Sequence, residues 1–340
     1  MPAGKSDPLG QFRDSTVLVT GGSGSIGTEI LRSVLRYSPK KVRVFTNDEN
    51  GLFELAQPFG KLPNVEFRLG DVRDLRSLDT AVEGCDYVFH AAALKHVDFC
   101  ETNPYEAITT NITGTQNVLD LCMKHKVKRF VFISTDKAVN PTSTMGATKL
   151  LAEKLVIRAS RQTDRTIFSS VRFGNVIGSR GSVILLFEKQ VRSGLPMTVT
   201  DPTMTRFIMA TSQAAMLVLR SSTIALPGEI FVLKMKTVRI GDLAEASRVF
   251  FAKMLGKRPE AIKVEVVGSR PGEKMHEELL NATDAGEALD LGDYYVVNPN
   301  PLRVSKGNLQ KAGHEAGLSS NDFTPMTVSD IVKEIGATYR

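Results

Sequence analysis

The first half of the chain alternates short apolar runs with amphipathic stretches. A β-branched run at residues 16–20 ends in glycines, and apolar residues at helical spacing follow over 26–37. Comparable apolar runs stand at 42–45, 65–71, 87–93 and 130–135, with helical patterns at 74–84 and 111–125. Short buried strands that alternate with amphipathic helices are typical of βαβ units. The pattern therefore predicts an α/β protein with a parallel, doubly wound sheet.

The alternation weakens in the second half of the chain, after about Arg172. Glycine, proline and serine become more frequent there, which indicates a smaller lobe beginning near Asn175. The run at 229–233 is the best candidate for a strand that returns to the sheet. We predict a sheet domain at 1–174, joined by 206–250, and a smaller C-terminal lobe made of 175–205 and 251–340.

The composition is that of an ordinary globular protein. The 340 residues are 42% hydrophobic and 24% charged, which excludes disorder, a coiled coil or collagen as an overall description. No apolar run approaches the ~20 residues needed to span a bilayer, and the N-terminus shows no signal-peptide core. The three scattered cysteines form no disulfide framework, so we expect a cytoplasmic location. The net charge of +6 leaves nucleic acid, an acidic membrane or an anionic small molecule as candidate partners.

A glycine-rich turn joins the first predicted strand to the first predicted helix. Gly21, Gly24 and Gly27 stand at GxxGxxG spacing, a wider variant of the dinucleotide fingerprint. Small residues let the backbone approach a pyrophosphate, and the helix N-terminus supplies donors and the positive end of its dipole. The alternative is a tight turn without a ligand, but the βαβ context favours a Rossmann-type site for NAD or NADP. The turn residues assigned to this site are Gly21, Ser23, Gly24, Ser25, Ile26 and Gly27.

The residues after the second predicted strand bear on the choice between NAD and NADP, but they point in both directions. An acidic side chain there accepts hydrogen bonds from the ribose hydroxyls of NAD and repels the 2′-phosphate of NADP. Thr46 comes first after the apolar run, Asn47 next and Asp48 only third, while no arginine stands beside Thr46 to hold a phosphate. We lean slightly to NADP. Asp71 and Val72, after the third strand, are expected to meet the adenine, although a helix N-cap is an equal alternative for Asp71.

Several longer motifs coincide further along the chain. They are the segments 90–97 (HAAALKHV), 101–107 (ETNPYEA), 110–115 (TNITGT), 134–141 (STDKAVNP), 145–149 (MGATK), 172–176 (RFGNV), 201–207 (DPTMTRF) and 270–274 (RPGEK). From about Ser15 to Leu280 the chain resembles an extended short-chain dehydrogenase/reductase. More narrowly, it resembles the UDP-N-acetylglucosamine 4,6-dehydratases of the polysaccharide-biosynthesis group. The segments around Lys95 and Asp136 are specific to this group, whereas the glycine turn is not.

The resemblance implies an internal redox reaction on a sugar nucleotide. The cofactor takes a hydride from sugar C4, water is lost across C5 and C6, and the hydride returns to C6. It further implies that Asp136 protonates the departing 6-hydroxyl and that Lys137 removes the C5 proton. Both residues directly follow a predicted strand, and ligands bind at the carboxyl ends of parallel strands. A lysine base needs a lowered pKa, for which Lys149 is a possible nearby cation.

Met145 departs from the usual family pattern. Short-chain dehydrogenases usually read Tyr-x-x-x-Lys, with the tyrosine as base for the hydroxyl that is oxidised, and here methionine takes its place. A thioether cannot take a proton. Three interpretations stay open: an inactive chain, another group such as Tyr105 in the role, or the dehydratase subgroup in which methionine replaces tyrosine, which we favour. That subgroup keeps the configuration at C5, and Thr135 is then a candidate for bonding the 4-hydroxyl, with its proton relayed through Asp136 or water.

By the same resemblance, the remaining residues divide between the cofactor and the sugar nucleotide. Lys149 binds the nicotinamide ribose, and Asn111 either supports the catalytic strand or caps a helix. The other cofactor positions are Ala91, Ala92, Ala93 and Lys95. The substrate positions are Lys95, His96, Asn175, Ser179, Arg180, Gly181, Ser182, Val183, Thr200, Arg206, Arg270 and Glu273. Of these, Arg180, Arg206 and Arg270 are expected to hold the diphosphate, and Glu273 to accept from a ribose hydroxyl.

Two other functions remain open on this scaffold. A nucleotide-sugar 4-epimerase shares the first hydride step but needs no acid and base aimed at C6 and C5, so Asp136 and Lys137 count against it. A non-catalytic NAD(P)-binding protein is the other, and Met145 supports it. The sequence has no basic stripe interleaved with aromatic residues, so it gives no indication of nucleic-acid binding. The histidines show no metal-ligand spacing. We therefore expect UDP-N-acetylglucosamine as substrate, no metal, no nucleic acid, no membrane segment in this chain, and a homo-oligomer.

Overall fold

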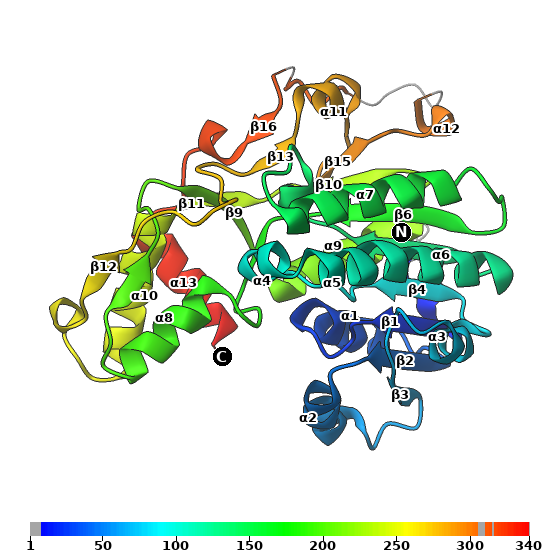
Figure 1. Ribbon diagram of the computed structural model, residues 1–340, viewed down its shortest axis with the longest axis horizontal. Coiled ribbons are helices and arrows are strands. Elements are labelled where there is room, and N and C mark those ends of the chain that lie inside the picture. The colour runs from blue at the N-terminus through cyan, green and yellow to red at the C-terminus, as the bar shows by residue number, and fades with distance from the viewer. Residues whose placement is uncertain (1–7, 305–309, 315, 340) are drawn as a thin grey trace, which may run out of the picture.

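The computed structural model describes residues 8–304, 310–314 and 316–339, and a nine-stranded sheet runs through its centre (Figure 1). The strand order is β14-β15-β10-β6-β5-β4-β1-β2-β3. All strands from β10 to β3 in this order run parallel, and β15 and β14 extend the edge antiparallel. The bounds are β1 Thr16–Thr20, β2 Lys41–Thr46, β3 Val65–Leu69, β4 Tyr87–His90, β5 Arg129–Ile133, β6 Ile167–Arg172, β10 Ile230–Leu233, β14 Leu289–Asp290 and β15 Tyr294–Val297.

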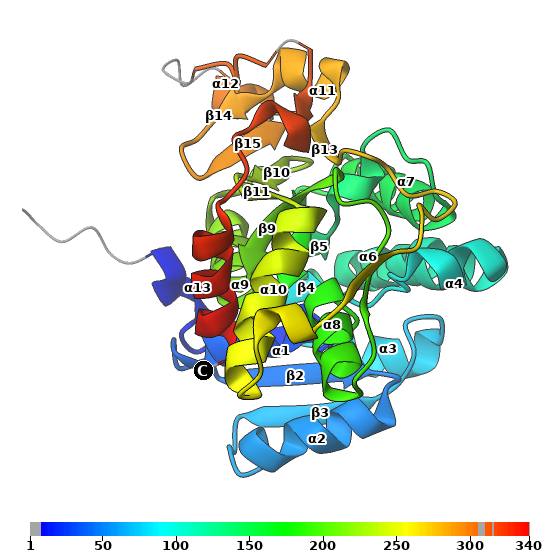
Figure 2. The ribbon, with the colours of Figure 1, turned by 90° about the vertical axis from the view of Figure 1, so that its left-hand side faces the viewer.

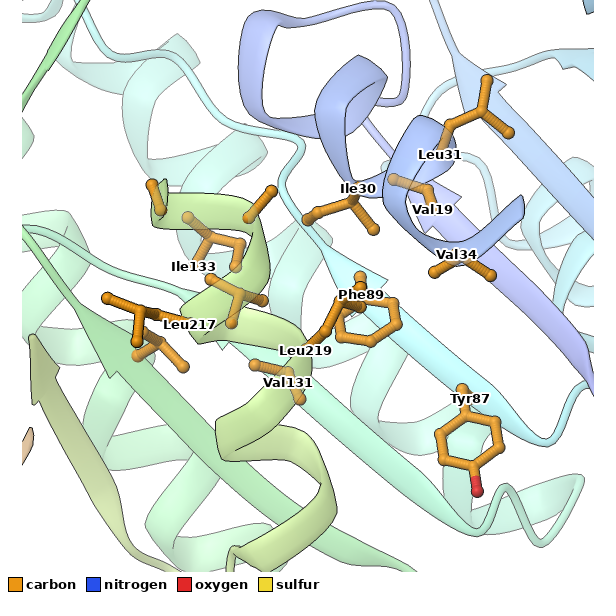
Figure 3. Close-up of a cluster of buried hydrophobic side chains, with 14 of the residues drawn as sticks. Val19, Ile30, Leu31, Val34, Tyr87, Phe89, Val131, Ile133, Leu217 and Leu219 are labelled. Carbon is orange, nitrogen blue, oxygen red and sulfur yellow. The ribbon is translucent and has the colours of Figure 1, made fainter. Parts of the chain in front are cut away.

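Helices cover both faces of this sheet. On one face lie α1 (Ser25–Leu35), α2 (Glu49–Phe59) and α9 (Thr211–Ile224), and on the other α3 (Leu75–Val82), α6 (Gly114–Lys124) and α7 (Thr144–Ala159). Val17 and Val19 of β1 pack on the first face and Leu18 on the second, because successive side chains of a strand alternate. Figure 3 shows Val19 and Phe89 against Ile30 of α1. The expected Rossmann-type parallel sheet is confirmed.

Three predicted strands end earlier than their apolar runs. The run at 87–93 forms strand only to His90, the run at 65–71 only to Leu69, and the run at 130–135 only to Ile133. The residues that follow leave the ladder and line a cavity at this edge of the sheet. The helical pattern over 111–125 also begins differently, because a π-helical turn at Thr109–Thr113 precedes α6.

A smaller unit packs beside the carboxyl edge of the sheet (Figure 2). Its apolar core joins α8, α10 and α13 to short strands, with Phe187, Phe251 and Ile335 fully buried at its centre. Its helices are α8 Val183–Arg192, α10 Ile240–Met254 and α13 Val328–Thr338, and its strands are β7 Asn175–Ile177, β8 Met197–Val199, β9 Thr205–Ala210, β11 Lys236–Arg239 and β12 Val264–Val266. Strands β11, β9 and β7 form one small sheet, and β12 pairs with β8. No helix in the described part of the chain is long and apolar enough to cross a membrane.

The C-terminal residues contribute to both units. The run at 229–233 is strand β10, which pairs parallel with β6, while β14 and β15 add an antiparallel edge that the sequence pattern does not indicate. The remaining elements are β13 (Glu278–Leu280), β16 (Leu318–Ser319), α4 (Val97–Thr102), α5 (Pro104–Ile108), α11 (Ala282–Glu287), α12 (Pro301–Val304), and the short turns η1 Pro8–Phe12, η3 Asp136–Ala138, η4 Pro259–Ala261 and η5 Ser320–Asp322. The division into 1–174 with 206–250, and 175–205 with 251–340, stays a prediction.

Candidate active site

A cavity of about 730 Å³ opens at the carboxyl edge of the parallel strands. Its walls come from the residues that follow β1, β2, β3, β4 and β5, and from the loops on either side of β7. This is the place where ligands bind in open α/β sheets, because the loops beyond neighbouring strand ends converge there. The cavity is therefore the candidate active site.

The glycine turn forms one wall and leaves no room for side chains. Gly21 has φ +64°, and a Cβ added to it would stand 2.6 Å from the backbone nitrogen of Ala92. A Cβ on Gly27 would stand 2.5 Å from the carbonyl oxygen of Gly21. The bare backbone and the start of the 11-residue helix α1 are thus open to the cavity. Such a cradle fits the pyrophosphate of a dinucleotide.

The side chain of Asp48 contacts the glycine turn, although Asp48 lies beyond the end of β2. Its Oδ1 accepts from the backbone N–H of Gly51 at 2.9 Å and thereby caps α2, while its Oδ2 accepts from the hydroxyl of Ser23 at 3.2 Å. The hydroxyls of Ser23 and Thr46 are 3.0 Å apart. The Gly51 hydrogen bond and the nearby Arg180 hold the pKa of Asp48 below its ordinary value. An ionised carboxylate therefore stands beside the turn, where a ribose would bind.

Residues 178–182, here called the clasp, cross from the smaller unit to the glycine turn. The guanidinium of Arg180 lies 3.0 Å from Asp48 and donates to the carbonyl oxygen of Ser23 at 2.7 Å. The backbone N–H of Arg180 donates to Ser25 Oγ at 2.8 Å, and Lys95 Nζ donates to the Arg180 carbonyl at 2.6 Å. Arg180, expected on the sugar diphosphate, thus bonds to the residues expected to bind the cofactor.

Asp136 and Lys137 form a short turn directly after β5. Asp136 is fully buried, and its Oδ1 accepts from Thr135 Oγ1 at 2.9 Å and from Lys137 Nζ at 3.1 Å. Thr135 and Lys137 line the cavity, and Asp136 lies behind them. Burial raises the pKa of Asp136 above its ordinary value. The pair therefore joins a buried carboxyl with a raised pKa to an amine at the cavity wall.

Glu277 completes this cluster, and the sequence does not single it out. Its Oε1 lies 2.9 Å from Lys137 Nζ and 3.8 Å from Arg206 Nε, and the residue is 2% exposed. The local sequence around 273–278 contains three glutamates, and nothing in it separates Glu277 from the others. Burial next to a lysine, which only the fold shows, is the signal that identifies it.

The pKa of Lys137 differs from the expectation for a base. Burial lowers it, but the two carboxylates of Asp136 and Glu277 outweigh this effect and raise the pKa above the ordinary value. The expected lowering is therefore wrong for this arrangement, and Lys137 is an ammonium. The neighbouring cation that lowers the pKa of Lys137 is Arg206 rather than Lys149. Lys149 does have a lowered pKa, about 8, because burial disfavours its charge.

The Met145 position lies at the cavity but is packed into apolar surroundings. Met145 is buried with Cys100 and Ala107, and it also lines the cavity. One helical turn on, Lys149 Nζ donates to the Ile133 carbonyl at 2.8 Å beneath the cavity wall. Tyr105 is 72% exposed and is not among the residues that line the cavity, so it does not replace the missing tyrosine.

Asp71 and Asn111, for which a helix cap is the alternative role, do not cap helices in the structure. Asp71 lines the cavity and accepts from Asn47 and Arg73, whose hydrogen bonds lower its pKa to about 2, while Asp74 caps the helix that follows. Asn111 lies in the π-helical turn, where its side chain accepts from the Leu94 N–H at 2.8 Å and donates to Thr148 at 2.9 Å. It therefore ties the loop after β4 to α7 rather than supporting β5 directly.

The predicted site residues fall into two groups. Those that line the cavity are Gly21, Ser23, Gly24, Ser25, Ile26, Gly27, Thr46, Asn47, Asp48, Asp71, Val72, Ala91, Ala92, Ala93, Lys95, His96, Thr135, Lys137, Met145, Lys149, Asn175, Ser179, Arg180, Gly181 and Ser182. Those outside its lining are Asn111, Asp136, Val183, Thr200, Arg206, Arg270 and Glu273. Lining residues that the sequence did not indicate are Phe45, Gly70, Arg73, Leu94, Glu106, Thr110, Ile133, Ser134, Phe173, Gly174 and Val176. Most of these directly adjoin predicted strand ends, a position that could have indicated them.

The two arginines outside the lining are paired with carboxylates. Arg206 is 5% exposed and lies 3.0 Å from Glu273 as well as near Glu277. Arg270 is exposed and forms an ion pair of 2.9 Å with Asp98 of α4. Glu273 accordingly bonds to an arginine rather than standing free at the cavity.

The fold and the site together define a class of protein. A glycine turn at the head of a parallel sheet, with a cavity beyond the carboxyl ends of the strands, is the arrangement of a Rossmann-type protein. More specifically, the chain belongs to the family of polysaccharide biosynthesis proteins, whose model matches residues 17–299. The family resemblance expected from the motifs is confirmed at this level.

Its relatives include proteins named for nucleotide-sugar and polysaccharide chemistry. The chain is 46% identical to the capsular polysaccharide biosynthesis protein CapD of Staphylococcus aureus over 281 residues, 81% of this chain and 46% of CapD. It is 42% identical to a UDP-glucose 4-epimerase of Rickettsia canadensis over 319 residues, 92% of this chain and 91% of that protein. The X-ray structure of Pen from Bacillus thuringiensis superposes with a TM-score of 0.89 at 42% identity, covering 96% and 98% of the two chains.

Proposed function

We propose that this protein is a UDP-N-acetylglucosamine 4,6-dehydratase that forms a UDP-2-acetamido-2,6-dideoxy-4-hexulose. The observation that carries the proposal is the pair of buried Asp136 and cavity-lining Lys137 just beyond the carboxyl end of β5. Loss of water across C5 and C6 requires an acid and a base on neighbouring carbons. Two adjacent side chains on one rigid turn are suited to that task, and an epimerase has no use for them.

We propose NAD as the cofactor, which when bound supplies hydride transfer to and from the sugar. The glycine turn takes its pyrophosphate, Lys149 its nicotinamide ribose, and Asp48 its adenine ribose. The ionised Asp48 beside Ser23 supports NAD over NADP, because it accepts from ribose hydroxyls and repels a 2′-phosphate. The sequence favours NADP slightly because Asp48 is only the third residue after the apolar run. In the structure the Asp48 side chain contacts Ser23 of the glycine turn, so this reason for NADP no longer holds.

Each side chain of the catalytic turn has a proposed task. Asp136, ionised at the start, takes up the proton of the 4-hydroxyl, holds it because burial raises its pKa, and donates it to the departing 6-hydroxyl. Thr135 bonds the 4-hydroxyl and passes its proton toward Asp136, to which it already donates at 2.9 Å. Only the neutral fraction of Lys137, which its raised pKa keeps small, takes the C5 proton; it returns the proton to the same face, which retains the configuration at C5. Met145 takes no part in proton transfer.

The remaining cavity residues are proposed to bind the sugar nucleotide. Asn175, Ser179 and Ser182 carry polar groups on the smaller unit, opposite the catalytic turn. Lys95 and His96 face the same space from the loop after β4. Bound between these two walls, the diphosphate lies next to the positive charges of Lys95 and Arg180, which favours an anion there.

The proposal predicts a product lighter by one water. Incubation with UDP-N-acetylglucosamine is expected to lower the mass of the sugar nucleotide by about 18 Da, with no net formation of reduced cofactor. Mass spectrometry and NMR of the product check this, and deuterated water places one deuterium at C5. The related Rickettsia protein is named a 4-epimerase, so an unchanged mass with conversion to the galacto isomer would establish that second candidate instead.

A second prediction concerns the clasp. Arg180→Ala is expected to speed dissociation of the dinucleotide about threefold to fivefold, since it removes the ion pair to Asp48 and the bond to the Ser23 carbonyl at an exposed site. Stopped-flow fluorescence of the reduced dinucleotide measures this rate. Arg192→Ala is the matched control, because Arg192 also forms an exposed ion pair, with Glu188 on α8, but does not line the cavity. Equal rates for the two variants would show that the clasp does not retain the cofactor.

A further inference from the structure

Lys137 is held by two carboxylates rather than by one. Its Nζ lies 3.1 Å from Asp136 Oδ1 and 2.9 Å from Glu277 Oε1. Both carboxylates are buried, and the second oxygen of each, Asp136 Oδ2 and Glu277 Oε2, has no hydrogen-bond partner among the described residues. One ammonium balances only one negative charge, so the second buried carboxylate needs either another cation or a proton.

The surroundings of the two carboxylates differ. Glu277 faces Arg206 at 3.8 Å and Lys274 in addition to Lys137, whereas Lys137 is the only cationic partner of Asp136 in the described part of the chain. Accordingly the cations lower the pKa of Glu277 despite its burial, and burial raises the pKa of Asp136. Environments that push the pKa values of two titratable groups apart suit the two groups to different tasks.

We propose that Glu277 is the positioning residue and permanent counterion of Lys137, which leaves Asp136 free to carry the proton it delivers as the catalytic acid. This inference rests on the dehydratase function proposed above. When Asp136 is protonated it no longer balances the lysine, and Glu277 keeps the ammonium in place at the cavity wall. Glu277 acts through Lys137 and does not touch the sugar.

The backbone around Glu277 is built to hold this position. The Glu277 N–H donates to Ser320 Oγ at 3.0 Å, and the Ser320 N–H donates to the Glu277 carbonyl at 2.8 Å. Ser320 also bonds Thr205, next to Arg206. Segments from three distant parts of the chain thus place one carboxylate against the amine of Lys137.

The charge state of Lys137 gives a direct test. In protein carrying ε-¹³C-lysine, with the Lys137 signal assigned through Lys137→Arg, Glu277→Gln is expected to lower the titration midpoint of Lys137 by about 1–3 pH units. The direction follows because removal of a negative charge destabilises the ammonium, while Asp136 and Arg206 remain. Glu278→Gln is the matched control, since Glu278 bonds Asn140 and Lys274 but not Lys137, and it leaves the midpoint unchanged. A midpoint that is unchanged or raised in Glu277→Gln overturns the proposal.

Two further measurements keep the test decisive. In the wild-type protein, carboxyl ¹³C NMR is expected to show Asp136 titrating at higher pH than Glu277, and the reverse order overturns the proposal even if Glu277→Gln does not fold. In the dehydration assay, the rise of kcat with pH is expected to move to lower pH in Glu277→Gln, because more Lys137 is neutral at each pH. If the wild type does not dehydrate the sugar nucleotide, the proposed function fails while both NMR results still decide the role of Glu277.

Discussion

Replacing Lys137 by alanine is expected to lower the kcat for dehydration of the sugar nucleotide by about 10²–10⁴-fold. Its amine lines the cavity next to the buried acid Asp136, and no other lysine bonds to Asp136 in the described residues. Binding of the dinucleotide is expected to be unchanged, because Asp48 and the glycine turn do not contact Lys137. Initial rates of product formation, together with a fluorescence titration of the reduced cofactor, separate the two effects.

A second substitution at the same position tells base catalysis from electrostatic support. Lys137→Arg keeps a positive charge between Asp136 and Glu277, but a guanidinium with a pKa above ~12 does not become neutral. If Lys137 removes the C5 proton, the arginine variant is as inactive as the alanine variant. An arginine variant that retains most of the wild-type rate would contradict the base assignment and leave Lys137 with a purely electrostatic role.

The parallel sheet was predictable because its central strands are buried on both faces. A run such as 16–20 is apolar or β-branched at every position, and glycines and an amphipathic helix follow it at once. The antiparallel edge was not predictable from the same rule. Strand β14 has only two residues, and β15 is placed by its pairing with β10, which lies far away in the sequence.

The site was predictable only where function follows a strand end. Thr135, Asp136 and Lys137 directly follow β5, so the position of the strand alone brings them to the carboxyl edge. Arg180 reaches Asp48 at the cavity, and Glu277 reaches Lys137, from segments that lie far away in the sequence. Their positions depend on tertiary packing that no local pattern encodes. The charge of Lys137 was misjudged for the same reason, because Glu277 was not among its expected neighbours.

The catalytic turn also depends on a buried ion cluster behind it. Ser134, just before Thr135, donates to Glu153 Oε1 at 2.6 Å, and the same carboxylate forms a bidentate pair with Arg172 at 2.8 and 3.1 Å. Arg172 further bonds Asp284 of α11 at 2.8 Å. The cluster therefore joins β5, α7, β6 and the C-terminal segment, so its loss affects both the fold and the position of the catalytic pair.

Arg172→Met is expected to lower the free energy of unfolding by about 3–5 kcal/mol. The side chain of Glu153 is 1% exposed, so removal of its partner leaves an uncompensated buried charge, and Asp284 and the Leu279 carbonyl lose their donor as well. Denaturant unfolding followed by circular dichroism measures the change. The double variant Glu153→Leu/Arg172→Met is the matched control, because replacing both members of a buried pair by apolar side chains removes the stranded charge. The double variant is expected to recover most of the lost stability, and a double variant as unstable as the single one would show that packing of the arginine stem, rather than charge balance, stabilises this region.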